Sequence, residues 1–238
     1  MSHANNNAVP GGPSWYSDAA EYWKNVEATV DGMLGGFSNL DDQDAADSIR
    51  FVQPLIDQGI IAKGSACDCG AGIGRVTKSF LSHLFSPIDL VEQDHHFINT
   101  AKTDPALNSG LVSRFIHCGL QSFNPEEHNI SYTGIVWCQW VLGHLTDDDL
   151  VAFFNRMVAV CPVIGVKENV ASGQYGEAEI DHQDSSMTRA EGAWRRIFKR
   201  AGLKVVKEQW QSGWPKGLYR VKSSKEAGVD DDDKTSRA

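Results

Sequence analysis

The chain has 238 residues, of which 41% are hydrophobic, and a formal net charge of −9 at pH 7. This length suits one α/β domain with a sizeable core and is too short for three domains. The acidic balance argues against nucleic acid as the main partner, because a phosphate-binding protein normally carries an excess of Lys and Arg. A basic peptide or an uncharged ligand fits the charge better.

The cysteine pattern and the hydropathy indicate a reducing, non-membrane location. The five cysteines, an odd number, lie mostly inside apolar runs. The chain has no Cys-x-x-Cys pair with a downstream Cys or His partner, which is the pattern that would indicate a metal site. The first residues lack the apolar core of a signal peptide, and the apolar run around 158–166 is far too short to span a membrane. We therefore expect a protein of the cytoplasm or the nucleus, with no metal and no membrane partner.

The ends of the chain differ in composition from its middle. Residues 1–14 are rich in Asn, Gly and Pro, and residues 223–238 form a charged tail, so we expect disorder in both. Residues 15–222 are predicted to form a single domain, which opens with a helical segment over 15–62. Two helices are expected in that segment, at 17–26 and 41–58.

Beyond this helical segment, strands and helices alternate. The alternation predicts a Rossmann-like α/β fold with a seven-stranded, mostly parallel sheet and helices on both faces. The last two strands have no helix between them, which indicates a C-terminal β-hairpin. In such sheets, ligands bind beyond the C-terminal ends of the strands. Strands are expected at 66–69, 88–91, 114–118, 135–138, 163–167, 204–209 and 218–221, and helices at 75–84, 95–102, 148–160 and 189–201.

A glycine-rich loop, DCGAGIGRVTK at 68–78, joins the first expected strand to the next helix. Gly70, Gly72 and Gly74 permit a sharp backbone turn and the close approach of a nucleotide-like ligand to a helix N-terminus. The dinucleotide pattern G-x-G-x-x-G/A would need a small residue where this chain has Arg75. A hydride-transfer cofactor is therefore disfavoured.

An acidic residue, Glu92, ends the second expected strand, 22 residues beyond Gly70. A carboxylate in this place can accept hydrogen bonds from both hydroxyls of a ribose. The glycine loop and the acidic strand end together indicate S-adenosylmethionine, a cationic cofactor without a phosphate. Arg75 is a candidate ligand for the carboxylate of its methionine part; the alternative is a surface arginine in the first turn of the helix.

Polar and aromatic residues follow three of the expected strand ends. The segment QWVLGHLTD at 139–147 places Gln139, Trp140 and His144 beyond one strand, and Asp147 is expected to cap the next helix. The next strand ends in VKEN at 166–169, and a loop then carries DHQDSS at 181–186. All three segments are expected to converge on one site.

With YWKNVEATVDGMLGGF at 22–37, these segments resemble the protein α-N-terminal methyltransferases. The resemblance spans roughly residues 16–221, and ATVDGMLGG, GAGIGR, QWVLGHLTD and D-x-x-D-S-S occur in the family's order. It implies S-adenosylmethionine-dependent mono-, di- or trimethylation of the free α-amine of Xaa-Pro-Lys or Xaa-Pro-Arg N-termini, with S-adenosylhomocysteine as the product. The partners would be protein or peptide N-termini, and we expect a monomer or a weak dimer.

The resemblance also assigns residues to the cofactor. Leu120 and Gln121 would flank the adenine, and Trp23 lies in a helical lid expected to close over both ligands. Taken alone, Gln121 could equally be a surface amide of a loop, and Trp23 a core anchor of its helix. The matching positions are Trp23, Gly70, Gly72, Arg75, Glu92, Leu120, Gln121 and Gln139.

On the peptide side, Trp140 matches the residue that packs against the substrate proline, and Asn169 the residue that holds the first backbone groups. Asp181 and Asp184 match an acidic pair that receives the third-position Lys or Arg. Taken alone, the tryptophan could be a core residue and the aspartates helix caps or solvated loop charges. Lesser peptide contacts match Leu34, Ser186 and Tyr219.

Methyl transfer needs an amine that has lost its proton, and an α-amine has a reference pKa of about 7.7–8.0. We expect His144 and Asp184 to accept or relay this proton while Asn169 and Trp140 hold the nitrogen in line. A histidine of this kind could also be a satisfied core residue. Two other functions stay open at this point: a small-molecule amine methyltransferase, and a non-catalytic binder of basic N-terminal peptides.

Overall fold

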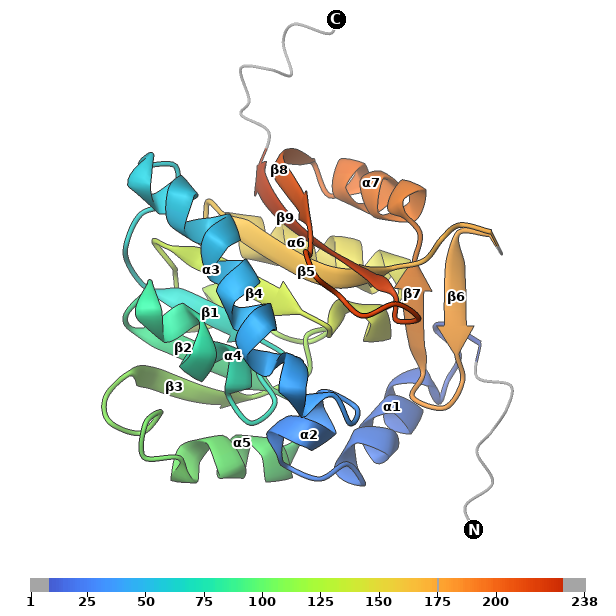
Figure 1. Ribbon diagram of the computed structural model, residues 1–238, viewed down its shortest axis with the longest axis horizontal. Helices are drawn as coiled ribbons and strands as arrows, with labels where there is room; N and C mark the ends of the chain where they lie inside the picture. Colours follow the sequence, from blue (N-terminus) through green and yellow to red (C-terminus); the bar gives the residue numbers. More distant parts are fainter. Residues whose placement is uncertain (1–8, 175, 229–238) are drawn as a thin grey trace, which may run out of the picture.

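The computed structural model describes residues 9–174 and 176–228. Its centre is a seven-stranded sheet with the order β3-β2-β1-β4-β5-β9-β8 (Figure 1). The five strands from β3 to β5 are parallel, and β9 runs antiparallel to both β5 and β8. The strands are β1 (Ala66–Cys69), β2 (Ile88–Glu92), β3 (Val112–His117), β4 (Ile135–Gln139), β5 (Ile164–Val170), β8 (Leu203–Trp210) and β9 (Arg220–Gly228).

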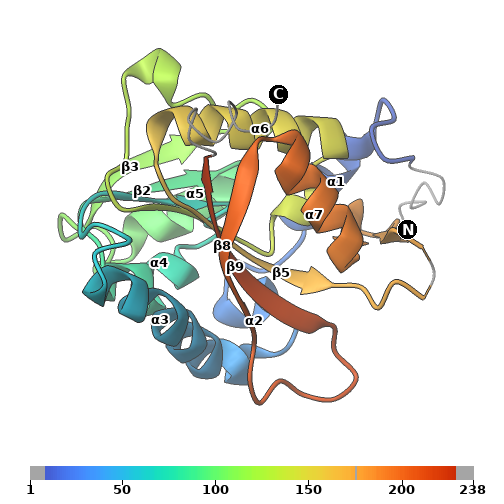
Figure 2. The same cartoon turned by 90° about the horizontal axis from the view of Figure 1, so that it is seen from above.

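Helices cover both faces of this sheet (Figure 2). Helices α3 and α4 lie on one face, and α6 lies on the other beside α7. The seven-stranded, mostly parallel sheet with its C-terminal hairpin confirms the predicted fold class. The helices are α1 (Trp15–Lys24), α2 (Val30–Met33), α3 (Asp41–Asp57), α4 (Arg75–Ser79), α5 (His95–Thr103), α6 (Asp147–Val160) and α7 (Glu191–Arg200).

Alternating side chains of the central strands build the two halves of the core. In β1, Cys67 and Cys69 pack toward α6 and α7, whereas Ala66 packs toward α3 and α4. Every residue of β1, β2 and β4 is buried, as expected for parallel strands covered on both sides. The sheet is therefore a rigid platform whose strand ends position the site.

The helix predicted at 75–84 is shorter than expected. Helix α4 ends at Ser79, and a 3-10 turn, Leu81–His83, follows it. Between them Phe80 leaves the helical conformation, with φ −133°, and its ring packs 4.9 Å from that of Trp137 in β4. Burying this aromatic ring against the sheet outweighs continuation of the helix.

The segment predicted as a loop at 181–186 is instead the turn of a β-hairpin. Strands β6 (Ala178–Asp181) and β7 (Ser186–Arg189) pair antiparallel, and Ser185 takes a left-handed φ of 53° in the turn. The fully buried Arg189 donates to the carbonyl oxygens of Leu142 and Leu145, at 3.1 and 2.6 Å. These bonds fasten the hairpin to the segment that follows β4.

The N-cap of α6 is Thr146, one residue before the predicted Asp147. The Thr146 side chain accepts a hydrogen bond from the Asp149 N–H at 3.2 Å, so Thr146 is the N-cap. Asp147 is the first helical residue, and its carboxylate accepts from Arg189 Nε at 2.9 Å. A threonine at the N-cap leaves Asp147 free to pair with the buried guanidinium.

The prediction of a disordered tail is wrong for residues 223–228, which belong to β9. This strand lies between β5 and β8, where pairing on both sides buries even Ser223 and Glu226. Main-chain pairing in a central strand thus overrides a charged composition. The rest of that tail, 229–238, and residues 1–8 of the expected N-terminal disorder lie outside the described residues; residues 9–14 form turns.

Three further observations on the described residues concern the cysteines, metal-binding side chains and membrane-spanning helices. All five cysteines are free. Within residues 9–174 and 176–228, no His, Cys, Asp and Glu side chains are grouped so that they could hold a metal ion. Over the same ranges, no helix combines the length and the apolar character needed to cross a bilayer.

We expect Glu226→Gln to stabilise the fold at alkaline pH. The Glu226 side chain is fully buried, neither of its oxygens has a hydrogen-bond partner among the described residues, and burial raises its pKa to about 8. Because the folded state holds this proton more tightly than the unfolded state, the free energy of unfolding falls as pH rises from about 4.5 to about 8. The variant should gain about 2–4 kcal/mol over the wild type near pH 9 and much less near pH 5.

Urea unfolding near these two pH values measures this difference. The exposed Glu21, changed to Gln, is the control and should stay within about 0.5 kcal/mol of the wild type. An equal effect of Glu226→Gln at both pH values would contradict a buried, protonated carboxyl group.

Candidate active site

Two adjoining cavities lie at the C-terminal ends of the parallel strands. The first, of about 910 Å³ counting its open mouth, lies between α1 and the ends of β1, β2 and β4. The second, of about 1010 Å³ counted in the same way, lies between the ends of β4 and β5, the β6–β7 hairpin and the loop between β8 and β9. Both cavities are lined by Trp23, Met33, Trp140 and His144.

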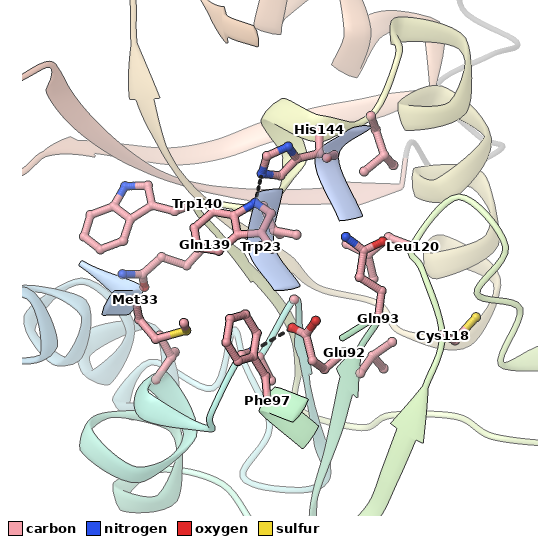
Figure 3. A pocket seen from close by; sticks show the side chains of 18 of the residues that line it. Trp23, Met33, Glu92, Gln93, Phe97, Cys118, Leu120, Gln139, Trp140 and His144 are labelled. Atoms are coloured by element: carbon pink, nitrogen blue, oxygen red, sulfur yellow. Dashed lines mark hydrogen bonds between the residues drawn. The ribbon is translucent and has the colours of Figure 1, made fainter. Parts of the chain in front are cut away.

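The first cavity gathers every residue that the sequence predicted for the cofactor. Figure 3 shows Glu92, Leu120 and Trp23 around it, together with Phe97, which sequence reasoning missed. The predicted residues that line it are Trp23, Gly70, Gly72, Arg75, Glu92, Leu120, Gln121 and Gln139.

The glycine loop has the geometry that its sequence implied. Gly70 and Gly72 have φ values of 73° and 55°, a region that favours glycine. A Cβ atom on Gly70 would lie 2.3 Å from Cγ2 of Val141, whose branched side chain cannot move away freely. A side chain at Gly70 would therefore both strain the turn and collide with the segment that follows β4.

Glu92 is fixed at the wall of the first cavity. Its two oxygens accept the N–H groups of Gly72 at 2.8 Å and Asp94 at 2.7 Å (Figure 3 draws the first of these bonds). Burial raises the pKa of Glu92, and these N–H donors act against that shift. The carboxylate is thus oriented at the end of β2, where a ribose would need it.

Arg75 is a buried residue of the cavity and not a surface arginine. Its Nη1 donates to Asp41 at 2.7 Å and to Asp44 at 2.9 Å, and its guanidinium lies 5.4 Å from the centre of the Trp140 ring. Both bonds come from one nitrogen, so the guanidinium has further N–H donors for an anionic ligand.

Asp44, which the sequence analysis did not single out, joins Arg75 to the sheet. Besides Arg75 it binds the ammonium group of Lys167 at 2.5 Å and the side-chain amide of Gln139 at 2.7 Å. Burial pushes the pKa of Asp44 up, but Lys167 and Arg75 outweigh this and hold it below its usual value. The only feature of the sequence that points to Asp44 is its spacing from Ser48 and Phe51, which puts all three residues on one face of α3.

The second cavity gathers all but one of the residues predicted for the peptide and for catalysis. Asp181 is the exception: its side chain is exposed beyond the lining, and its Oδ1 accepts the Gln183 N–H at 2.8 Å. The predicted residues that line it are Leu34, Trp140, His144, Asn169, Asp184, Ser186 and Tyr219.

His144 is held from both sides of its ring. Its Nε2 lies 3.0 Å from Trp23 Nε1, which can only donate (Figure 3). Its Nδ1 lies 3.1 Å from the Ser185 carbonyl oxygen, which can only accept. These partners select the neutral ring with the proton on Nδ1. Trp23 thus closes the cavities against His144 and is not a core anchor of its helix.

Asp184 presents an unoccupied acceptor. Its Oδ1 is buried and has no hydrogen-bond partner among the described residues. Burial raises the pKa of Asp184, whereas the Ser186 hydroxyl and, when its ring is protonated, nearby His144 act in the opposite direction. A buried carboxylate with a free oxygen is suited to accept a hydrogen bond or a proton from a cation in the cavity.

Sequence reasoning missed two further residues of this wall. Trp214, from the loop between β8 and β9, has its ring centre 6.0 Å from that of Trp140. Glu168 precedes Asn169 in β5 and accepts the N–H groups of Val141 and Leu142. A tryptophan in the Gly- and Pro-rich segment at 213–217 was an available signal for the first. The second lies in VKEN at 166–169, the strand end expected at the site, but nothing in that segment indicated its partners.

The first cavity fits S-adenosylmethionine. The oriented Glu92 carboxylate and the buried Arg75 guanidinium match a ribose and an amino-acid carboxylate, and Phe97 and Leu120 supply apolar walls for an adenine. The strand order, with one antiparallel strand inserted beside β5, and this cavity define a class I S-adenosylmethionine-dependent methyltransferase.

Within that class, the chain belongs to the AdoMet-dependent proline di-methyltransferase family, whose profile matches residues 12–225. It is 41% identical over 213 residues to the N-terminal Xaa-Pro-Lys N-methyltransferase 1 of Danio rerio, covering 87% of this chain and 93% of that protein. It is 44% identical over 214 residues to the alpha N-terminal protein methyltransferase 1 of Schizosaccharomyces pombe, covering 87% and 94%.

Solved structures agree. A SAM-dependent methyltransferase from Leishmania major superposes with a TM-score of 0.81 at 34% identity, covering 94% of this chain and 88% of that one. The magnesium protoporphyrin IX methyltransferase of Synechocystis, solved with bound SAM, has a TM-score of 0.60 at 16% identity, covering 91% and 94%. The second likeness concerns the fold alone.

Proposed function

We propose that this chain methylates the free α-amino group of protein N-termini that begin Xaa-Pro-Lys or Xaa-Pro-Arg, giving mono-, di- or trimethylated products. The observation that carries the proposal is the meeting of the two cavities at Trp140 and His144. A methyl donor in the first cavity and a peptide end in the second would meet there. The relatives from Danio rerio and Schizosaccharomyces pombe carry names that agree with this activity.

The second cavity suits a peptide of this type. The Trp140 ring offers a flat apolar face for a rigid proline, which loses little conformational entropy on binding. Asn169, at the end of β5, can bind the first backbone groups through its amide. Asp184 inside the cavity and Asp181 at its rim supply negative charge for a third-position Lys or Arg.

S-adenosylmethionine supplies the electrophilic methyl group, and the protein must hold the amine and remove its proton. An α-amine has a pKa of about 7.7–8.0, against about 10.4 for lysine, so only modest assistance is needed near neutral pH. Oδ1 of Asp184, which has no hydrogen-bond partner among the described residues, is the best-suited acceptor for the proton of the amine. His144 can receive the proton at Nε2 when Trp23 moves away, and its charged ring then favours the ionised form of Asp184.

The protein's partners are then free N-termini of other proteins, which are exposed after removal of the initiator methionine. The charge of −9 suits basic N-termini of this kind. We also expect a monomer or a weak dimer that acts in the cytoplasm or the nucleus.

Mass spectrometry of a Ser-Pro-Lys-Arg peptide after incubation with S-adenosylmethionine tests the proposal. The free peptide should gain up to three methyl groups at its α-nitrogen, and an N-acetylated copy should gain none. Methylation of the acetylated copy on lysine would contradict the α-amine assignment. Tight binding of the free peptide without methyl transfer would instead favour a non-catalytic binder.

A further inference from the structure

The short segment that follows β4 has an unusual backbone. Trp140 takes a left-handed φ of 53°, which is rare for a bulky residue and persists only where the surroundings hold it. The 3-10 turn Leu142–His144 follows directly. This one turn therefore sets the directions of both Trp140 and His144, which line the two cavities.

Strand β5 holds the N–H side of this turn. The Trp140 N–H donates to the Lys167 carbonyl oxygen at 3.1 Å. The next two N–H groups, of Val141 and Leu142, both donate to Oε1 of Glu168, at 2.9 and 2.8 Å. Successive N–H groups after a left-handed residue form a concave site for an acceptor, and here Oε1 of Glu168 fills it. Burial raises the pKa of Glu168 to about 7, and the two N–H donors act against that shift.

A cation holds the opposite side of the turn. The guanidinium of Arg189 donates to the carbonyl oxygens of Leu142 and Leu145. Both Glu168 and Arg189 are buried, with exposed fractions of 7% and 1%, so neither is a solvated surface charge. The turn is thus held between the Glu168 carboxyl group at its N–H donors and the Arg189 guanidinium at its carbonyl acceptors.

We infer that Glu168 is a positioning residue that fixes the Trp140 indole and thereby sets the selectivity for proline at the second position of the substrate. The inference rests on the proposed function. Without an acceptor at this place, the N–H groups of Val141 and Leu142 lose their only partner among the described residues. The left-handed turn can then relax, and the indole leaves its place beside Arg75 and Trp214.

Three variants separate this role from general stabilisation. Glu168→Gln keeps an oxygen that accepts both N–H groups, whereas Glu168→Met has a similar length and no such oxygen. Glu226→Met is the matched control, because it removes another buried carboxyl group from the adjacent strand, away from both cavities.

The first measurement needs no methyl transfer. Protein labelled with 5-fluorotryptophan gives a fluorine resonance for Trp140, identified by its absence in Trp140→Phe. Glu168→Met should shift this resonance, and Glu168→Gln and Glu226→Met should leave it in place. An unshifted Trp140 resonance in Glu168→Met, or an equal shift in Glu226→Met, would overturn the inference.

The second measurement is the ratio of kcat/KM for a Ser-Pro-Lys peptide to that for a Ser-Ala-Lys peptide. Glu168→Met should lower this ratio about tenfold, with the affinity for S-adenosylhomocysteine kept within about twofold. Glu168→Gln should keep the ratio within about threefold. A parallel loss on both peptides, or an unchanged ratio, would overturn the inference.

Two complications have separate answers. If Glu168→Met does not fold, Glu168→Asp replaces it, since the shorter side chain withdraws the acceptor and should also shift the resonance and lower the ratio. If the wild type methylates neither peptide, the proposed function fails, and the fluorine spectra still decide whether Glu168 positions the indole.

Discussion

Replacing Asp184 by asparagine is expected to lower kcat/KM for an Xaa-Pro-Lys peptide about 10²–10³-fold near neutral pH. Asp184 carries a buried carboxylate oxygen without a partner among the described residues, in a cavity that adjoins the cofactor cavity. Asparagine preserves the shape but removes both the charge that attracts an ammonium group and the site that takes its proton. The affinity for S-adenosylhomocysteine should not change, since Asp184 does not line the first cavity.

The pH dependence distinguishes proton acceptance from simple charge attraction. Near pH 9 an α-amine with a pKa of about 7.7–8.0 has already lost its proton, so the deficit of the variant should shrink there. Initial rates from about pH 6.5 to pH 9.5 measure this. A deficit that stays constant over the whole range would mean that Asp184 only binds the peptide.

Two further variants complete this comparison. Asp181→Asn is the matched control, because Asp181 is an exposed aspartate of the same hairpin, and it should lose less than about tenfold. His144→Phe should fall between the two, since His144 acts on the pKa of Asp184 from nearby and its Nε2 is already bonded to Trp23. Near-full turnover of both His144→Phe and Asp184→Asn at neutral pH would remove both residues from proton transfer.

The parallel half of the sheet could be predicted from the sequence because its strands are short apolar runs that alternate with helical patterns. The strand at 66–69 is observed with the predicted bounds, and the strands at 88–91 and 135–138 each extend by one residue. The second half of β9 could not be predicted in this way. Its residues SSKEAG at 223–228, part of the expected disordered tail, look solvated in sequence, and only pairing with β5 and β8 makes them part of an inner strand.

The residues of the site also fall into those that could be predicted from the sequence and those that could not. Gly70, Gly72 and Glu92 lie in a local motif with fixed spacing, and the structure brings them together in one cavity. Asp44 and Glu168 have no such motif, because each acts on partners more than 25 positions away, Gln139 for one and Val141 for the other. Contacts over such distances arise from the topology and leave no periodic signal in the sequence.

The second large effect is expected from Asp44→Ala, which should lower the free energy of unfolding by about 3–5 kcal/mol. Asp44 is 1% exposed and is bonded to Lys167, Arg75 and Gln139 at once. Removing it leaves the fully buried Lys167 ammonium without its counter-charge, which costs far more than the loss of a surface pair. Urea unfolding near pH 7 measures the loss, and Asp57→Ala, an exposed position of the same helix, should stay within about 0.5 kcal/mol of the wild type.

The pH dependence of the free energy of unfolding gives an independent check of the stabilisation by Asp44. Lys167 and Arg75 hold the pKa of folded Asp44 below its reference of 3.8, so its stabilisation is complete above pH 3.8 and is lost as pH falls through the folded value. The difference in the free energy of unfolding between wild type and Asp44→Ala should therefore narrow as pH falls below about 3.8.

Asp44→Ala should also weaken cofactor binding, because Arg75 and Gln139 line the first cavity and Asp44 orients both. We expect an approximately tenfold loss of affinity for S-adenosylhomocysteine in calorimetric titrations, which corresponds to about 1.4 kcal/mol. The contrary result would be a free energy of unfolding of Asp44→Ala within about 1 kcal/mol of the wild type and an unchanged affinity for S-adenosylhomocysteine. That result would mean that Lys167 finds another partner. Among the described residues, the other polar contacts of the Lys167 ammonium are neutral oxygens, on Ser48 and on the Asp44 backbone. A new charged partner for Lys167 would therefore require the N-terminal half of α3 to move.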